Sequence, residues 1–246
     1  MRLLTNAIPG SRAAAMPNAA NDSDDLDALV RRVDPDRWLS SRFIGDPGER
    51  ADVIALYAYD HELARAPRVA SNSLLGEIRL TWWREALDEI YEGREVRRHP
   101  TAQALAGAVA RRGLARAPLE AMIEARYREL DPAPLSEAEA LEWARDTAGR
   151  AAQAAVAVLD PAAAADRAIA AAGAWALARR VAERPDLRGG FQRMLAEGRL
   201  QAARLSAAAF PAVAHAVFAA ARARGRTSET FASRLRITLA VARGRI

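Results

Sequence analysis

Apolar side chains recur every three or four positions in two neighbouring segments, residues 50–66 and residues 74–91. This spacing places them on one face of a helix, so the pattern predicts two amphipathic α-helices. One position inside the first stripe is acidic, Asp60. Pro67 is expected to end the first helix, and Ser73 is a suitable N-cap for the second. The two stripes consist of Val53, Leu56, Tyr57, Leu63 and Ala64, and of Leu75, Ile78, Trp82, Trp83, Ala86, Leu87 and Ile90.

The same periodicity continues over most of the chain, between proline, glycine and capping residues. Residues 34–50 contain Pro35 and Pro47 and are expected to be irregular. Ser136 and Glu139 form an S-x-x-E capping box at the start of a long helix. Further helices are predicted at residues 22–33, 101–112, 119–130, 136–159, 162–183, 191–198, 200–224 and 228–242. No strand pattern of any strength occurs, so the predicted fold class is all-α.

Composition supports this prediction. The chain has 246 residues, enough for one domain with a sizeable core. Alanine, leucine, arginine and glutamate are frequent, and all four favour helices. No window of about 18 uninterrupted apolar residues occurs, so we expect no transmembrane helix. Residues 1–21 have no acid and no long apolar run. We expect them to be a disordered tail, or a stretch upstream of a true start at Met16, and residues 22–246 to form one helical domain.

The net charge is +5, which reflects an arginine-rich composition more than a dedicated anion-binding face. Cysteine is absent, which excludes disulfides, thiolate metal sites and a cysteine nucleophile. His61, His99 and His215 are far apart in sequence and have no metal-ligand spacing. His215 lies in an apolar segment and is expected to be a core residue. We expect no nucleic-acid partner.

Acidic residues three or four positions apart can hold Mg²⁺ against a diphosphate, because they point the same way on a helix. The best such cluster is Glu85, Asp88, Glu89 and Glu92. Most runs of this kind are solvated helix faces, so these residues are weak metal candidates. The adjacent pair Trp82 and Trp83 favours core packing. An aromatic wall beside a lipid-like ligand is compatible with that packing.

The segment EIRLTWWREALDEIYEG resembles the squalene/phytoene synthase family, in which a W-W-R helix follows the first aspartate-rich helix. The preceding ALYAYDHELAR resembles that first helix, and AAGAWALARRV resembles the start of a second aspartate-rich helix. The resemblance covers residues 34–190. It implies an isoprenoid synthase fold, a single helical bundle around a central cavity. It also implies two facing aspartate-rich motifs that bind Mg²⁺ and the diphosphates of prenyl substrates.

Both motifs are degenerate in this chain. The positions of the first motif are occupied by Asp60, Ala64, Arg65 and Arg68. Arginine in place of a carboxylate reverses the charge, so Mg²⁺ would be repelled there. In the second motif only Glu183 and Asp186 remain as acids, and Pro185 disturbs their helix. This pattern is closer to a divergent branch of the family, which includes the mitochondrial assembly factor for respiratory complex I and its bacterial relatives.

Three functions are consistent with this resemblance. The first is a non-catalytic family member that acts in binding or in respiratory-complex assembly and needs no cofactor. The second is an active Mg²⁺-dependent prenyltransferase with relocated acids, in which Glu85, Asp88 and Glu89 lie opposite Glu183 and Asp186. The third is a metal-free binder of a lipid or prenyl diphosphate, with arginines on the phosphate.

Isoprenoid or lipid ligands and assembly factors are the partners that these functions imply. We expect the protein in the cytoplasm or bound peripherally to the inner face of the membrane. The candidate ligand-binding residues are Tyr57, His61, Arg65, Arg68, Trp82, Trp83, Arg84, Arg179 and Arg180.

Overall fold

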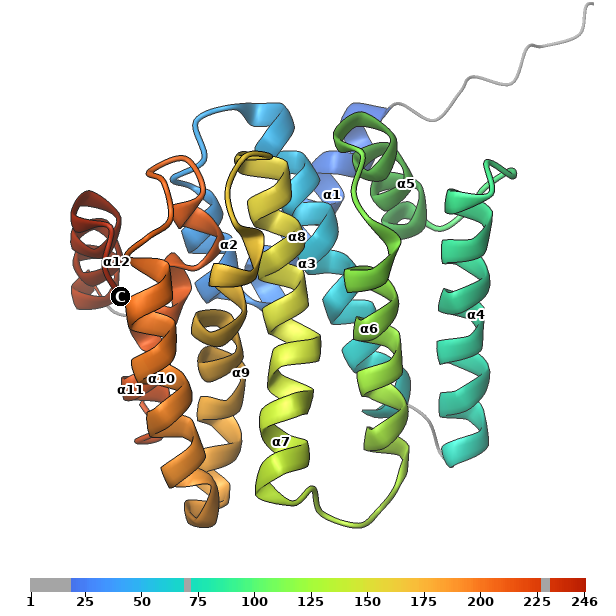
Figure 1. Cartoon of the computed structure of the whole chain (residues 1–246). Coiled ribbons are helices and arrows are strands. Elements are labelled where there is room, and N and C mark those ends of the chain that lie inside the picture. The colour runs from blue at the N-terminus through green and yellow to red at the C-terminus, as the bar shows by residue number, and fades with distance from the viewer. Residues whose placement is uncertain (1–18, 69–71, 227–230) are drawn as a thin grey trace, which may run out of the picture.

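The computed structural model describes residues 19–68, 72–226 and 231–246, and within these ranges it contains only helices and their connections (Figure 1). The all-α prediction is therefore confirmed. The predicted tail lies outside the described residues, except that Ala19–Asn21 belong to the first helix. The helices are α1 (Ala19–Val33), α2 (Pro35–Ser41), α3 (Pro47–Arg68), α4 (Ser73–Tyr91), α5 (Pro100–Arg112), α6 (Arg116–Tyr127), α7 (Glu137–Ala144), α8 (Arg150–Leu159), α9 (Ile169–Glu183), α10 (Arg188–Ala202), α11 (Ala219–Arg222) and α12 (Phe231–Arg243).

Two helices, α3 and α9, form the inside of the bundle. α3 contacts α1, α4, α5, α6 and α8, and α9 contacts α7, α10 and α11. Every residue from Asp52 to Asp60 is buried, so the middle of α3 is enclosed on all sides. Neighbouring helices thus hold α3 and α9 in fixed positions, and residues of both line a cavity between them.

Glycine lets α9 approach its neighbours closely. A Cβ atom on Gly198 of α10 would lie 2.6 Å from the Cα atom of Ala171. A Cβ atom on Gly173 would lie 3.2 Å from the carbonyl oxygen of Ala144 in α7. At 2.6 Å a side chain would collide with backbone, and at 3.2 Å the neighbouring backbone would have to shift slightly, so residues without a side chain favour this packing of α7, α9 and α10.

The predicted long helix at residues 136–159 is confirmed, with one irregularity. Ser136 caps it as expected, because its hydroxyl accepts from the Glu139 amide and the Glu139 carboxylate accepts from the Ser136 amide. Between α7 and α8 the helix widens into a π-helical turn at Arg145–Gly149. Such turns insert an extra residue and are frequent at functional sites.

Two predictions of local structure were wrong. Residues 34–50 contain a helix, α2, because Asp34 accepts a hydrogen bond from the Arg37 amide (3.1 Å) and Pro35 occupies the first helical position, where no N–H is needed. The predicted helix at residues 200–224 is broken. α10 ends at Ala202. Two short 3₁₀ turns then precede α11, and the first of them contains Pro211, which cannot donate a helical hydrogen bond.

Smaller shifts affect helix ends. α9 begins at Ile169 and not at residue 162, because Asp160 turns the chain by accepting from the Ala162 amide (3.2 Å). α3 continues one residue past Pro67, and Asn72 caps α4 in place of Ser73 (2.9 Å to the Leu75 amide). Of the residues at these shifted helix ends, Arg68 lines the cavity.

Candidate functional site

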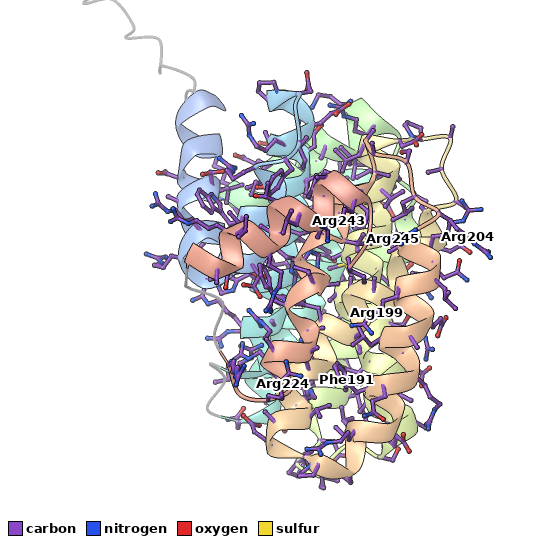
Figure 2. The ribbon with its side chains drawn as sticks, turned by 90° about the vertical axis from the view of Figure 1, so that its left-hand side faces the viewer. Phe191, Arg199, Arg204, Arg224, Arg243 and Arg245 are labelled. Carbon is purple, nitrogen blue, oxygen red and sulfur yellow. The ribbon has the colours of Figure 1, made fainter. Side chains whose placement is uncertain are left out.

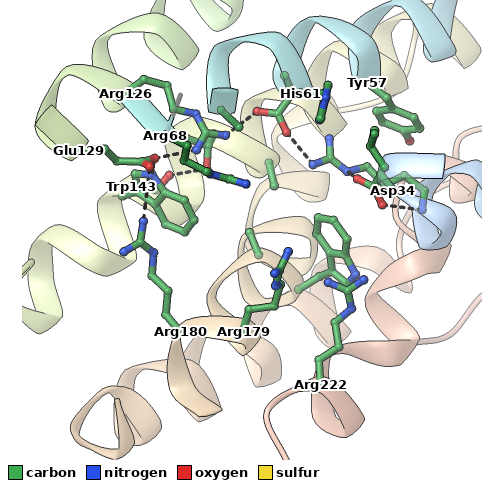
Figure 3. Close-up of a pocket in the computed structure, with 18 of the residues that line it drawn as sticks. Asp34, Tyr57, His61, Arg68, Arg126, Glu129, Trp143, Arg179, Arg180 and Arg222 are labelled. Atoms are coloured by element: carbon green, nitrogen blue, oxygen red, sulfur yellow. Dashed lines mark hydrogen bonds and ion pairs between the residues drawn. The ribbon is translucent and has the colours of Figure 1, made fainter. Parts of the chain in front are cut away.

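The cavity has a volume of about 470 Å³, and its upper wall in Figure 3 is one face of α3. Tyr57, Asp60, His61, Ala64 and Arg68 line it. These residues are three or four positions apart, so they project from the same side of the helix. The face includes three of the four positions of the degenerate first motif.

The opposite wall is α9, which contributes Trp175, Ala176, Arg179, Arg180 and Glu183. α9 also carries the second degenerate motif. The two motifs therefore face each other across the cavity, which is the arrangement that the resemblance implied. The space between them is closed by side chains from α2, α6, α7 and α11.

Asp60 is held by two arginines from other helices. Its carboxylate accepts from Arg37 of α2 (2.6 Å) and from Arg126 of α6 (2.8 Å), and all three side chains are buried. Burial alone would raise the pKa of Asp60, but the two guanidinium groups outweigh it and lower this pKa to about 2. Asp60 is therefore ionised and fully engaged with cations at neutral pH.

Glu129 is engaged in the same way at the other end of the cavity. It accepts from Arg126 (2.6 Å) and from the indole nitrogen of Trp143 (2.5 Å). The guanidinium of Arg180 lies 4.0 Å from the centre of the Trp143 ring and 3.8 Å from the Glu129 carboxylate. The third acid, Asp34, lies 2.8 Å from the Nε atom of Arg37. These three carboxylates are neutralised by arginine.

Positive charge exceeds negative charge in the cavity. Its lining contains six arginines and four acids. Arg68 of α3 and Arg179 of α9 have no ion pair with any acid that the structure describes. Burial and the nearby Arg126 lower the pKa of Arg68, which indicates an environment that disfavours further positive charge. An anion bound between α3 and α9 would relieve this repulsion.

Aromatic rings form the remainder of the wall. Arg37 and Arg222 lie 4.8 Å and 4.7 Å from the centre of the Trp175 ring. The Tyr57 hydroxyl is buried and has no hydrogen-bond partner within the described structure, although the residue lines the cavity. A buried polar group without a partner is uncommon. The hydrogen-bonding capacity of the Tyr57 hydroxyl is thus unused at the wall of the cavity.

The sequence matches the squalene/phytoene synthase family over residues 30–242. The chain belongs to this family. No curated protein sequence matches it. Two solved structures are similar to this chain in fold. One is a dehydrosqualene synthase in complex with ligand (TM-score 0.70, 13% identity, 91% of this chain and 96% of that chain).

The second similar structure is the squalene synthase HpnC from Alicyclobacillus acidocaldarius (TM-score 0.62, 16% identity, 92% of this chain and 95% of that chain). At such low identity the similarity concerns the fold alone. The all-helical isoprenoid synthase fold that the sequence resemblance implied is thereby confirmed.

Five of the predicted ligand-binding residues lie together in the cavity of this squalene/phytoene synthase-like chain: Tyr57, His61, Arg68, Arg179 and Arg180. The other four lie elsewhere. Arg65 is turned away from the cavity and pairs with Glu62 (3.0 Å). Arg65, Trp82 and Trp83 line a separate depression of about 290 Å³. Arg84 pairs with Glu124 on the surface.

The acids proposed to have been relocated do not surround the cavity. Glu89 pairs with Arg97 (2.6 Å) and Asp88 with Arg116 (2.6 Å) on the outer side of α4, and Glu85 is 3.2 Å from Arg97. The Arg97 guanidinium lowers the pKa of Glu89 to about 2. Of the second-motif remnants, Glu183 lines the cavity, whereas Asp186 pairs with Arg184 outside it.

The residues of the cavity do not fit the Mg²⁺ ions that the family implies. Magnesium needs several carboxylate or water oxygens around one point. Asp34, Asp60 and Glu129 direct their oxygens at arginines, which leaves Glu183 as the acid of the lining without an ion pair to a described residue. Within the described ranges, no group of three His, Asp or Glu side chains is placed to hold a metal.

Sequence reasoning missed five charged residues of the cavity: Asp34, Arg37, Arg126, Glu129 and Arg222. One signal was available, because Asp60 interrupts an apolar stripe and a buried carboxylate requires a cationic partner. The sequence did not identify the partners, because Arg37 is 23 positions and Arg126 is 66 positions from Asp60.

Proposed function

We propose that this protein is a non-catalytic member of the squalene/phytoene synthase family that binds an anionic, lipid-like ligand in its cavity without metal. The observation that supports this proposal is the charge of the lining. Arginines neutralise three of its four acids, and Arg68 and Arg179 on facing helices have no described ion-pair partner.

Guanidinium groups replace Mg²⁺ in this proposal. A guanidinium offers fixed N–H donors that match phosphate oxygens in pairs. Arg68 and Arg179 would bind a phosphate or diphosphate group directly from opposite walls. The aromatic side chains Trp143 and Trp175 would contact the adjoining part of the ligand. A cavity of about 470 Å³ is within the range of small-molecule sites.

The test is calorimetric titration with farnesyl diphosphate in the presence of EDTA. We expect saturable binding that Mg²⁺ does not strengthen. Arg68→Gln and Arg179→Gln should each weaken binding about tenfold or more, as expected for the loss of a charged hydrogen bond. Arg94→Gln and Arg193→Gln are matched controls, because both arginines are exposed and far from the cavity lining. Unchanged affinity in the two cavity variants would contradict the proposal.

Absence of catalysis is tested separately. The purified protein is incubated with farnesyl or geranylgeranyl diphosphate and Mg²⁺, and pyrophosphate is measured. We expect no enzymatic release, because the acids that would hold the metal are committed to arginines. Pyrophosphate release at an enzymatic rate would instead support the alternative, an active prenyltransferase of this family.

A role in respiratory-complex assembly is the second candidate, and one observation favours it. Leu74, Leu75 and Ile78 at the start of α4 are 60%, 41% and 54% exposed. They belong to residues 61–91, HELARAPRVASNSLLGEIRLTWWREALDEIY, a sequence that resembles the complex I assembly branch in particular. The role predicts that cells without the protein lose assembled complex I, and that Leu74→Ser with Leu75→Ser fails to restore it. Normal complex I in those cells would exclude this role.

A further inference from the structure

Helix α12 has apolar residues on both of its faces. Its inner face, with Ile237 and Ala240 buried, packs against the 3₁₀ turn Ala214–Phe218. Leu235 and Leu239 are four residues apart and point away from it, with exposed fractions of 53% and 41%. The solvent side of a surface helix is ordinarily polar. The outer face of α12 is therefore an apolar stripe that no described part of the chain covers.

Arginines flank this stripe on both sides. With 3.6 residues per turn, Arg236 and Arg243 project on one side of the two leucines and Arg234 on the other. α12 contains no acidic residue. None of the three arginines has an ion pair with a described acid, and all three are exposed. No acid in the described part of the chain thus compensates their charge.

Further arginines lie on the same side of the molecule, where α10 and α12 face the viewer in Figure 2. Leu200 of α10 is 70% exposed. The asymmetry extends over the whole chain, since residues 198–246 contain nine arginines and one acid, whereas residues 1–197 contain 27 arginines and 30 acids. The arginines labelled on this side are Arg199, Arg204, Arg224, Arg243 and Arg245 (Figure 2).

We propose that this side of the protein docks on an anionic membrane surface, with α12 lying in the plane of the interface. Leu235 and Leu239 would enter the boundary between headgroups and acyl chains, and the flanking arginines would contact lipid phosphates. Exposed apolar side chains between cations match such a boundary, because phosphates lie directly beside hydrocarbon there.

Charge complementarity supports a membrane as the occupant of this face, because exposed arginines without a described acidic partner match anionic headgroups. Residues 1–18 carry two arginines and no acid, so their charge has the wrong sign to cover it. Among the described residues, no helix is long and apolar enough to cross a bilayer.

The test is sedimentation with vesicles, using the full-length protein. Wild type should bind vesicles of equal parts phosphatidylglycerol and phosphatidylcholine, and should not bind pure phosphatidylcholine. Changing Arg234, Arg236 and Arg243 to Gln together should reduce binding about a hundredfold at low salt, as expected for three cations at an anionic surface. Leu235→Ser with Leu239→Ser should reduce it at least about tenfold, because the inserted apolar area is lost.

Matched control variants distinguish an effect of the α12 face from a general effect of net charge or exposed apolar area. Arg84, Arg94 and Arg116 changed together to Gln remove the same charge from ion pairs around α4, away from α10 and α12. Leu74→Ser with Leu75→Ser removes an exposed leucine pair from α4. Both control proteins should bind vesicles like wild type. All variants should bind the cavity ligand normally, so a failure here is distinct from a failure of the cavity proposal.

Two results would overturn the proposal. One is wild-type protein that does not sediment with anionic vesicles, or α12 variants that sediment as well as wild type. The other is a dimer in size-exclusion chromatography that the leucine variant converts to a monomer without a change in vesicle binding. In that case the stripe contacts a second copy of the chain.

Discussion

Asp60 offers the most direct test of how this fold tolerates charge in its interior. In the variant Asp60→Asn, the guanidinium groups of Arg37 and Arg126 stay buried but lose their shared anion. Removing one partner of a buried ion pair costs about 3–5 kcal/mol. Because the amide can still accept a hydrogen bond, we expect a loss of about 3 kcal/mol in the free energy of unfolding, measured by urea denaturation and circular dichroism at about pH 7.

The pH dependence of stability gives an independent signature of the same interaction. The pKa of Asp60 falls from 3.8 to about 2 on folding. A carboxyl with a lowered folded-state pKa stabilises the protein above its unfolded pKa, and this contribution disappears as the pH falls through the folded value. Wild type should therefore lose about 2 kcal/mol between about pH 4 and pH 2 that Asp60→Asn does not lose.

Asp186→Asn is the matched control. Asp186 also pairs with an arginine, but 56% of its side chain is exposed, so this change should leave the free energy of unfolding nearly unchanged. The reasoning is refuted if Asp60→Asn is no more destabilising than Asp186→Asn. It is also refuted if the acid sensitivity of wild type and Asp60→Asn is the same.

Three further predictions concern packing, capping and a buried histidine. Gly198→Ala should cost about 1–3 kcal/mol in denaturation experiments, because its methyl group would collide with the Ala171 backbone. Ser136→Ala should cost about 1 kcal/mol by the same measurement, because the capping box is lost. Burial, with Arg37 nearby, holds the pKa of His215 far below its usual value. The unfolded chain then takes up this proton first, so stability should fall below about pH 6.5 in wild type and less in His215→Leu, monitored by thermal unfolding.

Local patterns in the sequence were sufficient for most of the helices, because the spacing of apolar residues and the caps act within a few positions. α3 and the capping box at Ser136 are examples. α2 was missed because Pro35 was interpreted as a helix breaker, although proline is favourable in the first helical turn. The break after Ala202 was missed because alanine-rich sequence favours helix at every position, so Pro211 was the single local signal against it.

The cavity was harder to predict, because its residues come from distant parts of the chain. Arg65 and Arg68 illustrate the limit. Both replace acids of the first motif, yet only Arg68 lines the cavity and Arg65 points into a separate depression. The helical spacing within α3 shows that the two side chains point in different directions. It does not show which of them faces the cavity, because that depends on where α9 lies. The His215 prediction was confirmed, since an apolar segment alone indicated burial, and the residue is 1% exposed.

The π-helical turn at Arg145–Gly149 sets the register of the cavity wall. The extra residue rotates α8 by about 100° relative to an uninterrupted continuation of α7. Trp143, Thr147 and Ala148 can therefore face the cavity while α8 keeps its own buried face. Deleting one residue from this turn would leave a regular helix. Either the cavity-lining residues or the buried face of α8 would then be rotated away from its present position. This segment should consequently tolerate changes of residue type far better than changes of length.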